Sequence, residues 1–120
     1  MPIITIKKGG IGVLRVSGNM MSVREPANLH KKVKKLIDAG IPWIIIDMGQ
    51  VAWLNSKGIG ALVSSLTSCR NAGGELVVTR ATRKIKSLFQ ITQIIKLIDT
   101  YDNIREAKKV LKTKMTDANG

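Results

Sequence analysis

The segment Asn55-Ser56-Lys57-Gly58-Ile59-Gly60 contains the most informative set of potentially chemical residues in this chain of 120 residues. It follows a short apolar stretch and precedes a helical pattern, so the Ser56 hydroxyl is predicted at the N-terminus of a helix. A phosphate there would meet free backbone N–H groups and the positive end of the helix dipole. A structural role also fits, because Asn55 or Ser56 could simply cap the helix while the glycines allow close packing.

The segment matches no common catalytic motif. Lys57 precedes the glycines, so the Gly-x4-Gly-Lys spacing of a P-loop is absent. Leu54 stands two positions before Ser56, where the nucleophile elbow of an α/β-hydrolase requires glycine. One histidine and one cysteine cannot form a Cys/His zinc site, and the 8 acidic residues form no cluster along the chain. The ordinary catalytic sets are therefore disfavoured, although an enzyme built on paired carboxylates remains possible.

The elements before this segment follow from the hydrophobic pattern. Two stretches rich in β-branched residues, Ile3 to Lys8 and Ile11 to Val16, flank Gly9-Gly10, which predicts an antiparallel hairpin. Apolar residues at helical spacing then predict a helix from Glu25 to about Gly40. The apolar run from Trp43 to Ile46 predicts a strand that is buried on both faces.

The elements after the serine complete an alternating order. We expect helices from about Lys57 to Arg70, from about Arg80 to Phe89 and from Asp102 onward, and a strand at Leu76 to Thr79. The stretch from Ile94 to Tyr101 fits a helix or a strand, and we favour a strand near Lys96 to Thr100. The order ββαβαβαβα predicts the α/β class, with a mixed sheet, an N-terminal hairpin and about four helices. We expect one domain over residues 1–115 and a loose tail over residues 116–120.

Four further side chains are assigned structural roles. Asp47 is expected to close its strand and to accept hydrogen bonds from loop N–H groups. Ser65 and the neighbouring hydroxyl residues are expected on the outer face of the helix that follows Ser56. His30 is expected at the surface, and Cys69 is expected to be a small packed side chain.

The charge of the chain bears on its partners. There are 20 Lys and Arg residues against 8 Asp and Glu residues, which gives a formal net charge of +12 and a long-range attraction for anions. The cations gather on three predicted helices, for which solvated faces are the simplest interpretation. A nucleic-acid or anionic-surface binder would also use them, but the aromatic residues fall mostly at core-like positions and leave no stacking platform. An acidic protein is therefore the favoured partner.

The sequence also predicts where the protein resides. No apolar run approaches the roughly 18 residues of a membrane-spanning helix. The N-terminus lacks the basic-then-apolar order of a signal peptide. We therefore expect no membrane insertion and a cytoplasmic location.

Three motifs resemble the STAS domain of bacterial anti-sigma factor antagonists. They are the strand Ile44-Ile45-Ile46-Asp47, the bridge Val51-Ala52-Trp53-Leu54, and Ser56-x-Gly58-Ile59-Gly60. In that family an apolar strand that ends in Asp is followed by Asp-Ser-Ser/Thr-Gly-Leu-Gly. The resemblance continues through Gly73-Gly74-Glu75-Leu76 and reaches Ala107, so it covers nearly the whole chain.

The resemblance implies a phosphorylation switch that is not an enzyme and needs no cofactor. The serine that matches Ser56 is phosphorylated by an anti-sigma factor, which is a serine kinase of the histidine-kinase-like ATPase fold. The unphosphorylated domain binds that partner and releases the sigma factor, and a PP2C-type phosphatase resets the cycle. The residues expected at the partner interface are Asn55, Ser56, Lys57, Gly58 and Ile59. The alternatives are a STAS scaffold of a larger signalling assembly, or a basic module that binds nucleic acid or an anionic surface.

Two residues depart from the family pattern. Asn55 replaces the Asp before the serine, which keeps the capping capacity and removes a charge. Lys57 replaces the usual Ser or Thr after the serine, and it could pair with a phosphate or exclude a basic partner.

Overall fold

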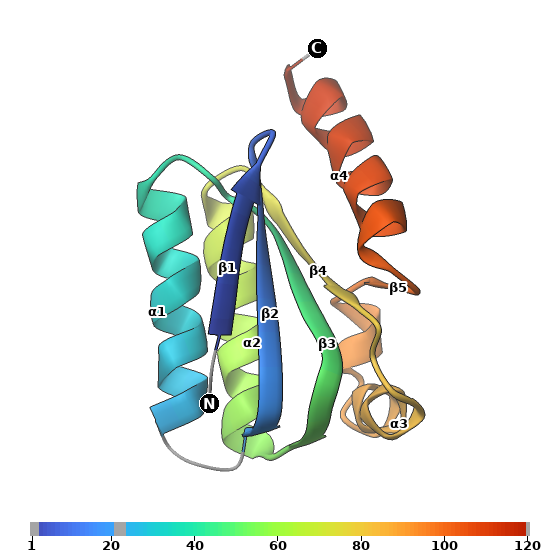
Figure 1. Cartoon of the computed structure of the whole chain (residues 1–120). Helices are drawn as coiled ribbons and strands as arrows, with labels where there is room; N and C mark the ends of the chain where they lie inside the picture. The colour runs from blue at the N-terminus through green and yellow to red at the C-terminus, as the bar shows by residue number, and fades with distance from the viewer. Residues whose placement is uncertain (1–2, 21–23, 120) are drawn as a thin grey trace.

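A computed structural model, which describes residues 3–20 and 24–119, contains one mixed sheet of five strands in the order β1-β2-β3-β4-β5 (Figure 1). The strands are β1 (Ile3–Lys8), β2 (Ile11–Met20), β3 (Trp43–Leu54), β4 (Glu75–Thr79) and β5 (Thr100–Tyr101). The first pair is antiparallel and the remaining pairs are parallel. Gly9 and Gly10 both have positive φ angles, 61° and 80°, as the tight hairpin turn between β1 and β2 requires.

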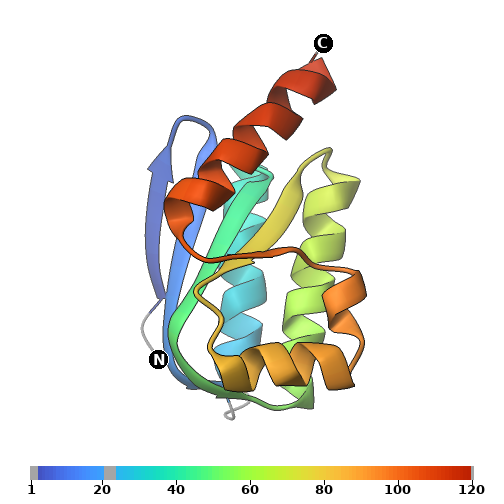
Figure 2. The same cartoon turned by 90° about the vertical axis from the view of Figure 1, so that its right-hand side faces the viewer.

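Helices cover both faces of the sheet (Figures 1 and 2). The helical elements are α1 (Arg24–Asp38), α2 (Ser56–Asn71), α3 (Arg83–Ile91), the 3-10 helix η1 (Ile94–Lys96) and α4 (Ile104–Asn119). The larger core joins one sheet face to α1, α2, α3 and η1, whereas Ala107 and Leu111 of α4 pack on the opposite face against β2, β3 and β4. The predicted α/β class, with its N-terminal hairpin and mixed sheet, is confirmed.

The central strand is longer than the sequence suggested. The prediction that a strand ends at Asp47 and a separate apolar stretch follows is wrong, because β3 continues without interruption to Leu54. Its second half pairs only with β2, which itself extends beyond Val16 to Met20, whereas β4 stops opposite Asp47 at Thr79. Two register shifts between β2 and β3 accompany this extension, and they carry β3 to the start of α2.

The C-terminal elements also differ from expectation. The strand expected near Lys96 to Thr100 is only Thr100–Tyr101, and the residues before it form η1. Gln93 adopts a left-handed conformation with φ 63°, which ends α3 and turns the chain into η1. The tail expected to be loose from residue 116 is helical as far as Asn119, because the backbone hydrogen bonding of α4 simply continues. No helix among the described residues is long and apolar enough to cross a membrane.

Candidate functional site

Asn55 caps α2 and so determines the position of Ser56. The Asn55 backbone is extended, and its side-chain oxygen accepts a hydrogen bond of 2.9 Å from the backbone N–H of Gly58. Its carbonyl accepts the first helical bond, 3.0 Å long, from the N–H of Ile59. Of the two caps that the sequence allowed, the structure therefore has Asn55, and Ser56 is the first residue of the helix.

The five residues expected at the partner interface differ in exposure. Ser56 and Lys57 are exposed, Asn55 and Ile59 are half-buried, and Gly58 is buried. Ile59 also packs against the larger core. Within the described part of the chain the Ser56 hydroxyl makes no hydrogen bond, because the neighbouring amide already performs the capping. The accessible chemistry at this helix end consists of one free hydroxyl and one ammonium group.

The start of α3 lies beside the end of β3 (Figure 1). Thr82 caps α3 by accepting a hydrogen bond of 3.3 Å from the N–H of Ile85. Lys84, in the first turn, places its Nζ atom 4.9 Å from the centre of the half-buried ring of Trp53, which is three residues before Ser56. Sequence reasoning missed this contact, because hydrophobic periodicity put Lys84 on an outer face without showing which strand that face adjoins.

The first turns of α2 and α3 share an unusual electrostatic character. Neither contains an acidic residue, although both helix N-termini carry the positive end of a helix dipole. They contain Lys57, Arg83 and Lys84, all of which are exposed. This end of the molecule is therefore strongly positive, and an anionic group added there would meet a favourable potential.

A second polar cluster lies in the middle of the sheet. The carboxylate of Asp47, only 1% exposed, accepts two hydrogen bonds of 2.9 and 3.0 Å from the guanidinium of Arg80. Arg15, its register partner on β2, lies 3.6 Å away, and the N–H of Gly49 donates a bond of 3.1 Å. Asp47 thus accepts a backbone N–H bond as expected, but its donor Gly49 belongs to β3 and not to a loop. Both arginines were missed because they are distant from Asp47 in the sequence. The hydrogen bonds from Arg80 to Asp47, together with the negative charge of that carboxylate, raise the pKa of Arg80.

Arg80 has an unusual backbone conformation and is closely approached by Gly49. It has a left-handed φ of 54°, which turns its side chain back over the sheet toward Asp47. A Cβ atom at Gly49 would lie 2.5 Å from the guanidinium carbon of Arg80, so any larger residue there would force the Arg80 side chain away from its present position. The cluster ties β3 to the chain leaving β4, and we assign it a structural role.

The outer face predicted for α2 is only partly solvated. The expectation that Ser65 lies on an outer face of α2 is wrong, because Ser65 is fully buried. His30 on α1 is half-buried, and its Nε2 atom lies 3.5 Å from the hydroxyl of Ser68. Cys69 is packed as expected, and its burial raises the pKa of the thiol to about 12.

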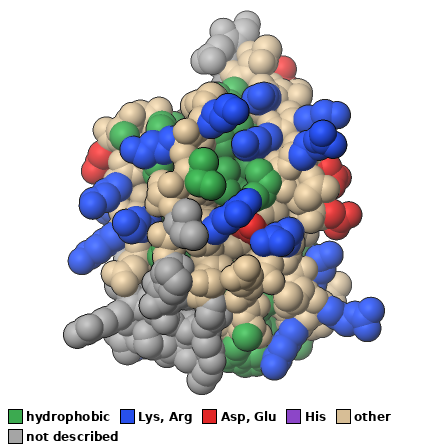
Figure 3. Space-filling view, in the orientation of Figure 1, with side chains coloured by type: hydrophobic (Ala, Val, Ile, Leu, Met, Phe, Trp, Pro, Cys, Tyr) green, Lys and Arg blue, Asp and Glu red, His purple; other side chains and the backbone are tan. Residues whose placement is uncertain are grey.

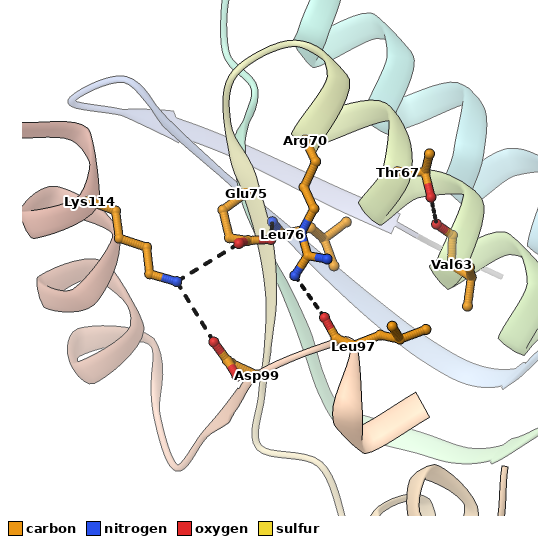
Figure 4. A network of polar contacts seen from close by, with 8 residues as sticks. All are labelled: Val63, Thr67, Arg70, Glu75, Leu76, Leu97, Asp99 and Lys114. Atoms are coloured by element: carbon orange, nitrogen blue, oxygen red, sulfur yellow. Dashed lines mark hydrogen bonds and ion pairs between the residues drawn. The ribbon is translucent and has the colours of Figure 1, made fainter. Parts of the chain in front are cut away.

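The opposite end of α2 has its cations paired with carboxylates (Figure 4). Arg70 donates a hydrogen bond of 3.0 Å to Glu75 and one of 2.8 Å to the carbonyl of Leu97. Lys114 of α4 lies 3.8 Å from both Glu75 and Asp99. This network fastens α2, β4 and α4 together, and its two carboxylates, Glu75 and Asp99, lie at the end of α2 opposite to Ser56.

Comparison with known proteins assigns the family. A sequence model of the STAS domain matches residues 2–107, so the chain belongs to the STAS domain family. A protein of Thermotoga maritima with the provisional name anti-sigma factor antagonist is 25% identical over 92 residues, which cover 75% of this chain and 81% of that protein.

Solved structures share the fold. An anti-sigma factor antagonist from Mycobacterium paratuberculosis superposes with a TM-score of 0.80 and 21% identity, covering 92% of this chain and 93% of that one. The Bacillus cell fate determinant SpoIIAA in its phosphorylated form gives a TM-score of 0.71 and 14% identity, covering 91% of this chain and 99% of that one.

Proposed function

We propose that this protein is an anti-sigma factor antagonist whose binding to a serine kinase is switched by phosphorylation of Ser56. The observation that carries the proposal is the free, exposed Ser56 hydroxyl at the first position of α2, beside an asparagine that already caps the helix. A kinase can therefore modify Ser56 without removing a bond that holds the fold. The presence of named anti-sigma factor antagonists among the relatives supports this assignment.

Phosphorylation at this position changes the surface and leaves the fold in place. A phosphoserine adds about −1.5 to −2 charges at neutral pH, and the N-terminus of a helix tolerates such a group well. In a tight interface the same charge must be desolvated, which prevents binding. The partner is a serine kinase and anti-sigma factor of the histidine-kinase-like ATPase fold, and a PP2C-type phosphatase restores the unmodified serine.

A catalytic role for Ser56 is disfavoured by its surroundings. A nucleophilic serine needs a base within hydrogen-bond reach. His30 lies instead against Ser68, which is about 18 Å along α2 from Ser56 at 1.5 Å per residue. We therefore propose a binding function rather than catalysis.

Two experiments test this function. Incubation with native cytoplasmic lysate and ATP should add one phosphate at Ser56, seen by intact-mass measurement, and Ser56→Ala should remain unmodified. Titration calorimetry with the isolated kinase should then show that Ser56→Asp binds far more weakly than Ser56→Ala, because only Asp introduces a charge. An unmodified Ser56 would favour a STAS scaffold, and equal affinities of the two variants would refute the switch.

A further inference from the structure

We propose that the partner surface facing Ser56 is acidic, and that a phosphate on Ser56 weakens binding by neutralising a cationic surface formed by Lys57, Arg83 and Lys84. We call these three residues the cationic end. The inference rests on the proposed function and adds the chemistry of the partner. It follows from side chains at the starts of α2 and α3, which the tertiary structure brings to one end of the molecule (Figures 1 and 2).

Lys84 is already positioned for a partner. Its ammonium lies over the ring of Trp53 at 4.9 Å, within the range of a cation–π contact. That contact restricts a long side chain before any partner arrives, so less conformational entropy is lost on binding. The ring itself belongs to the strand that leads into Ser56, and the held charge is therefore close to the modified residue.

The cationic end lacks internal counter-charges. Among the residues that the structure describes, Lys57, Arg83 and Lys84 form no ion pair with a carboxylate. Four other cations are paired: Arg15 and Arg80 with Asp47, and Arg70 and Lys114 with Glu75. The three carboxylates in these pairs and in the second Lys114 pair, Asp47, Glu75 and Asp99, thus serve contacts elsewhere in the fold.

The stability of the helices does not explain these cations. Positive side chains in the first turn of a helix are disfavoured by the helix dipole, and both first turns lack the acidic residues that would compensate. An external acidic surface supplies the missing charge. Opposite charges across an interface also accelerate association and exclude partners of the wrong sign.

A protein fits this surface better than a nucleic acid does. Lys84 covers the ring of Trp53, so that ring is not available for stacking on a base. An apolar residue accompanies the cations on α2, where Ile59 is half-buried in the turn that contains Lys57, and α3 ends in Ile91, which is 78% exposed. Figure 3 shows Lys and Arg side chains beside hydrophobic ones at the lower right of the molecule. Apolar groups within a polar rim are typical of protein interfaces.

The charge balance gives the switch its direction. The cationic end carries three positive charges when Ser56 is unmodified. A phosphate of about −1.5 to −2 charges cancels most of them and faces the acidic partner with a charge of like sign. Loss of attraction and gain of repulsion therefore act together.

Charge-reversal variants test the inference. The binding partner is the serine kinase purified from native lysate, with ATP-dependent phosphorylation of Ser56 as the assay that identifies it in each fraction. Titration calorimetry would compare the wild type with Lys57→Glu, Lys84→Glu, Lys84→Arg and, as a matched control on α4, Lys112→Glu. We expect Lys57→Glu and Lys84→Glu to bind the kinase at least about tenfold more weakly than the wild type does. The affinities of Lys84→Arg and Lys112→Glu should stay within about twofold of the wild-type value. Wild-type affinity should fall between about 50 and about 300 mM NaCl. Thermal unfolding would verify that each variant is folded.

Each possible result has a distinct meaning. If no kinase in the lysate modifies Ser56, the proposed function fails and the inference fails with it. If Ser56 is modified but the two charge reversals leave the kinase affinity unchanged, only the inference is overturned. A duplex DNA of about 20 base pairs serves as the competing probe. Loss of DNA binding in the Glu variants with unchanged kinase affinity would assign the cationic end to nucleic acid instead.

Discussion

Replacement of Asn55 by alanine should destabilise the protein, whereas replacement of Ser56 should not. The Asn55 side chain accepts a bond of 2.9 Å from the N–H of Gly58, and Gly58 is buried, so water cannot easily replace the lost acceptor. Loss of an N-cap costs about 0.5–2 kcal/mol, and a buried unpaired N–H places this case in the upper half of that range. We therefore expect a loss of about 1.5 kcal/mol for Asn55→Ala.

The corresponding shift in melting temperature can be derived from chain length. An unfolding entropy of about 2.1 cal/mol/K per residue gives about 0.25 kcal/mol/K for this chain, so Asn55→Ala should lower Tm by about 6 °C. Ser56→Ala should leave Tm unchanged or slightly raised, because alanine has the higher helix propensity. Circular dichroism melts would measure both, and urea titrations with equal m-values would confirm that the unfolded states are comparable.

The comparison of the two variants can refute the reasoning about the site. If Ser56→Ala lowers Tm more than Asn55→Ala does, Ser56 is the cap in solution and its hydroxyl is not free. Asn55→Asp is the informative control, since aspartate retains a capping oxygen and adds a charge that the helix dipole favours by about 0.3–1 kcal/mol. That variant should be at least as stable as the wild type at neutral pH.

Three further predictions address other residues. Lys57→Ser should slow phosphorylation of Ser56 by the proposed kinase, measured by intact mass over time, because it removes a charge that we propose to face an acidic surface of that kinase; an unchanged rate would contradict this. Gly49→Ala should displace the guanidinium of Arg80 and destabilise the protein by about 1–3 kcal/mol in urea titrations, and adding Arg80→Ala to it should cost little more. Cys69, whose pKa is raised to about 12 by burial, should react with a thiol reagent at pH 8 only as fast as the protein opens, and rapid labelling of the native state would refute its burial.

Local features of the sequence determined most of the fold. Gly9-Gly10 between two β-branched stretches predicted the hairpin, and both glycines indeed have the positive φ angles of a tight turn. The change from alternating to helical periodicity predicted the helix after Ser56, and the residue types restricted its cap to Asn55 or Ser56. These predictions held because turn geometry and amphipathic periodicity depend on neighbours within a few positions of the chain.

Features that depend on distant residues required the tertiary structure. The continuation of β3 past Asp47 goes with the length of β2, which pairs with it as far as Leu54, and β5 forms only where Thr100 and Tyr101 run beside Val78 and Thr79. Asn55, and not Ser56, caps α2 because Asn55 is the residue with extended backbone between the end of β3 and the first turn of the helix.

Side-chain contacts across the fold were the least predictable. Arg80 reaches Asp47 from 33 positions away, and Lys84 reaches Trp53 from another element. Periodicity identifies which residues of an element face outward, but it does not show which element lies opposite. The sequence therefore determined the serine and its helix, and the packing of α3 against β3 decided which charges surround them.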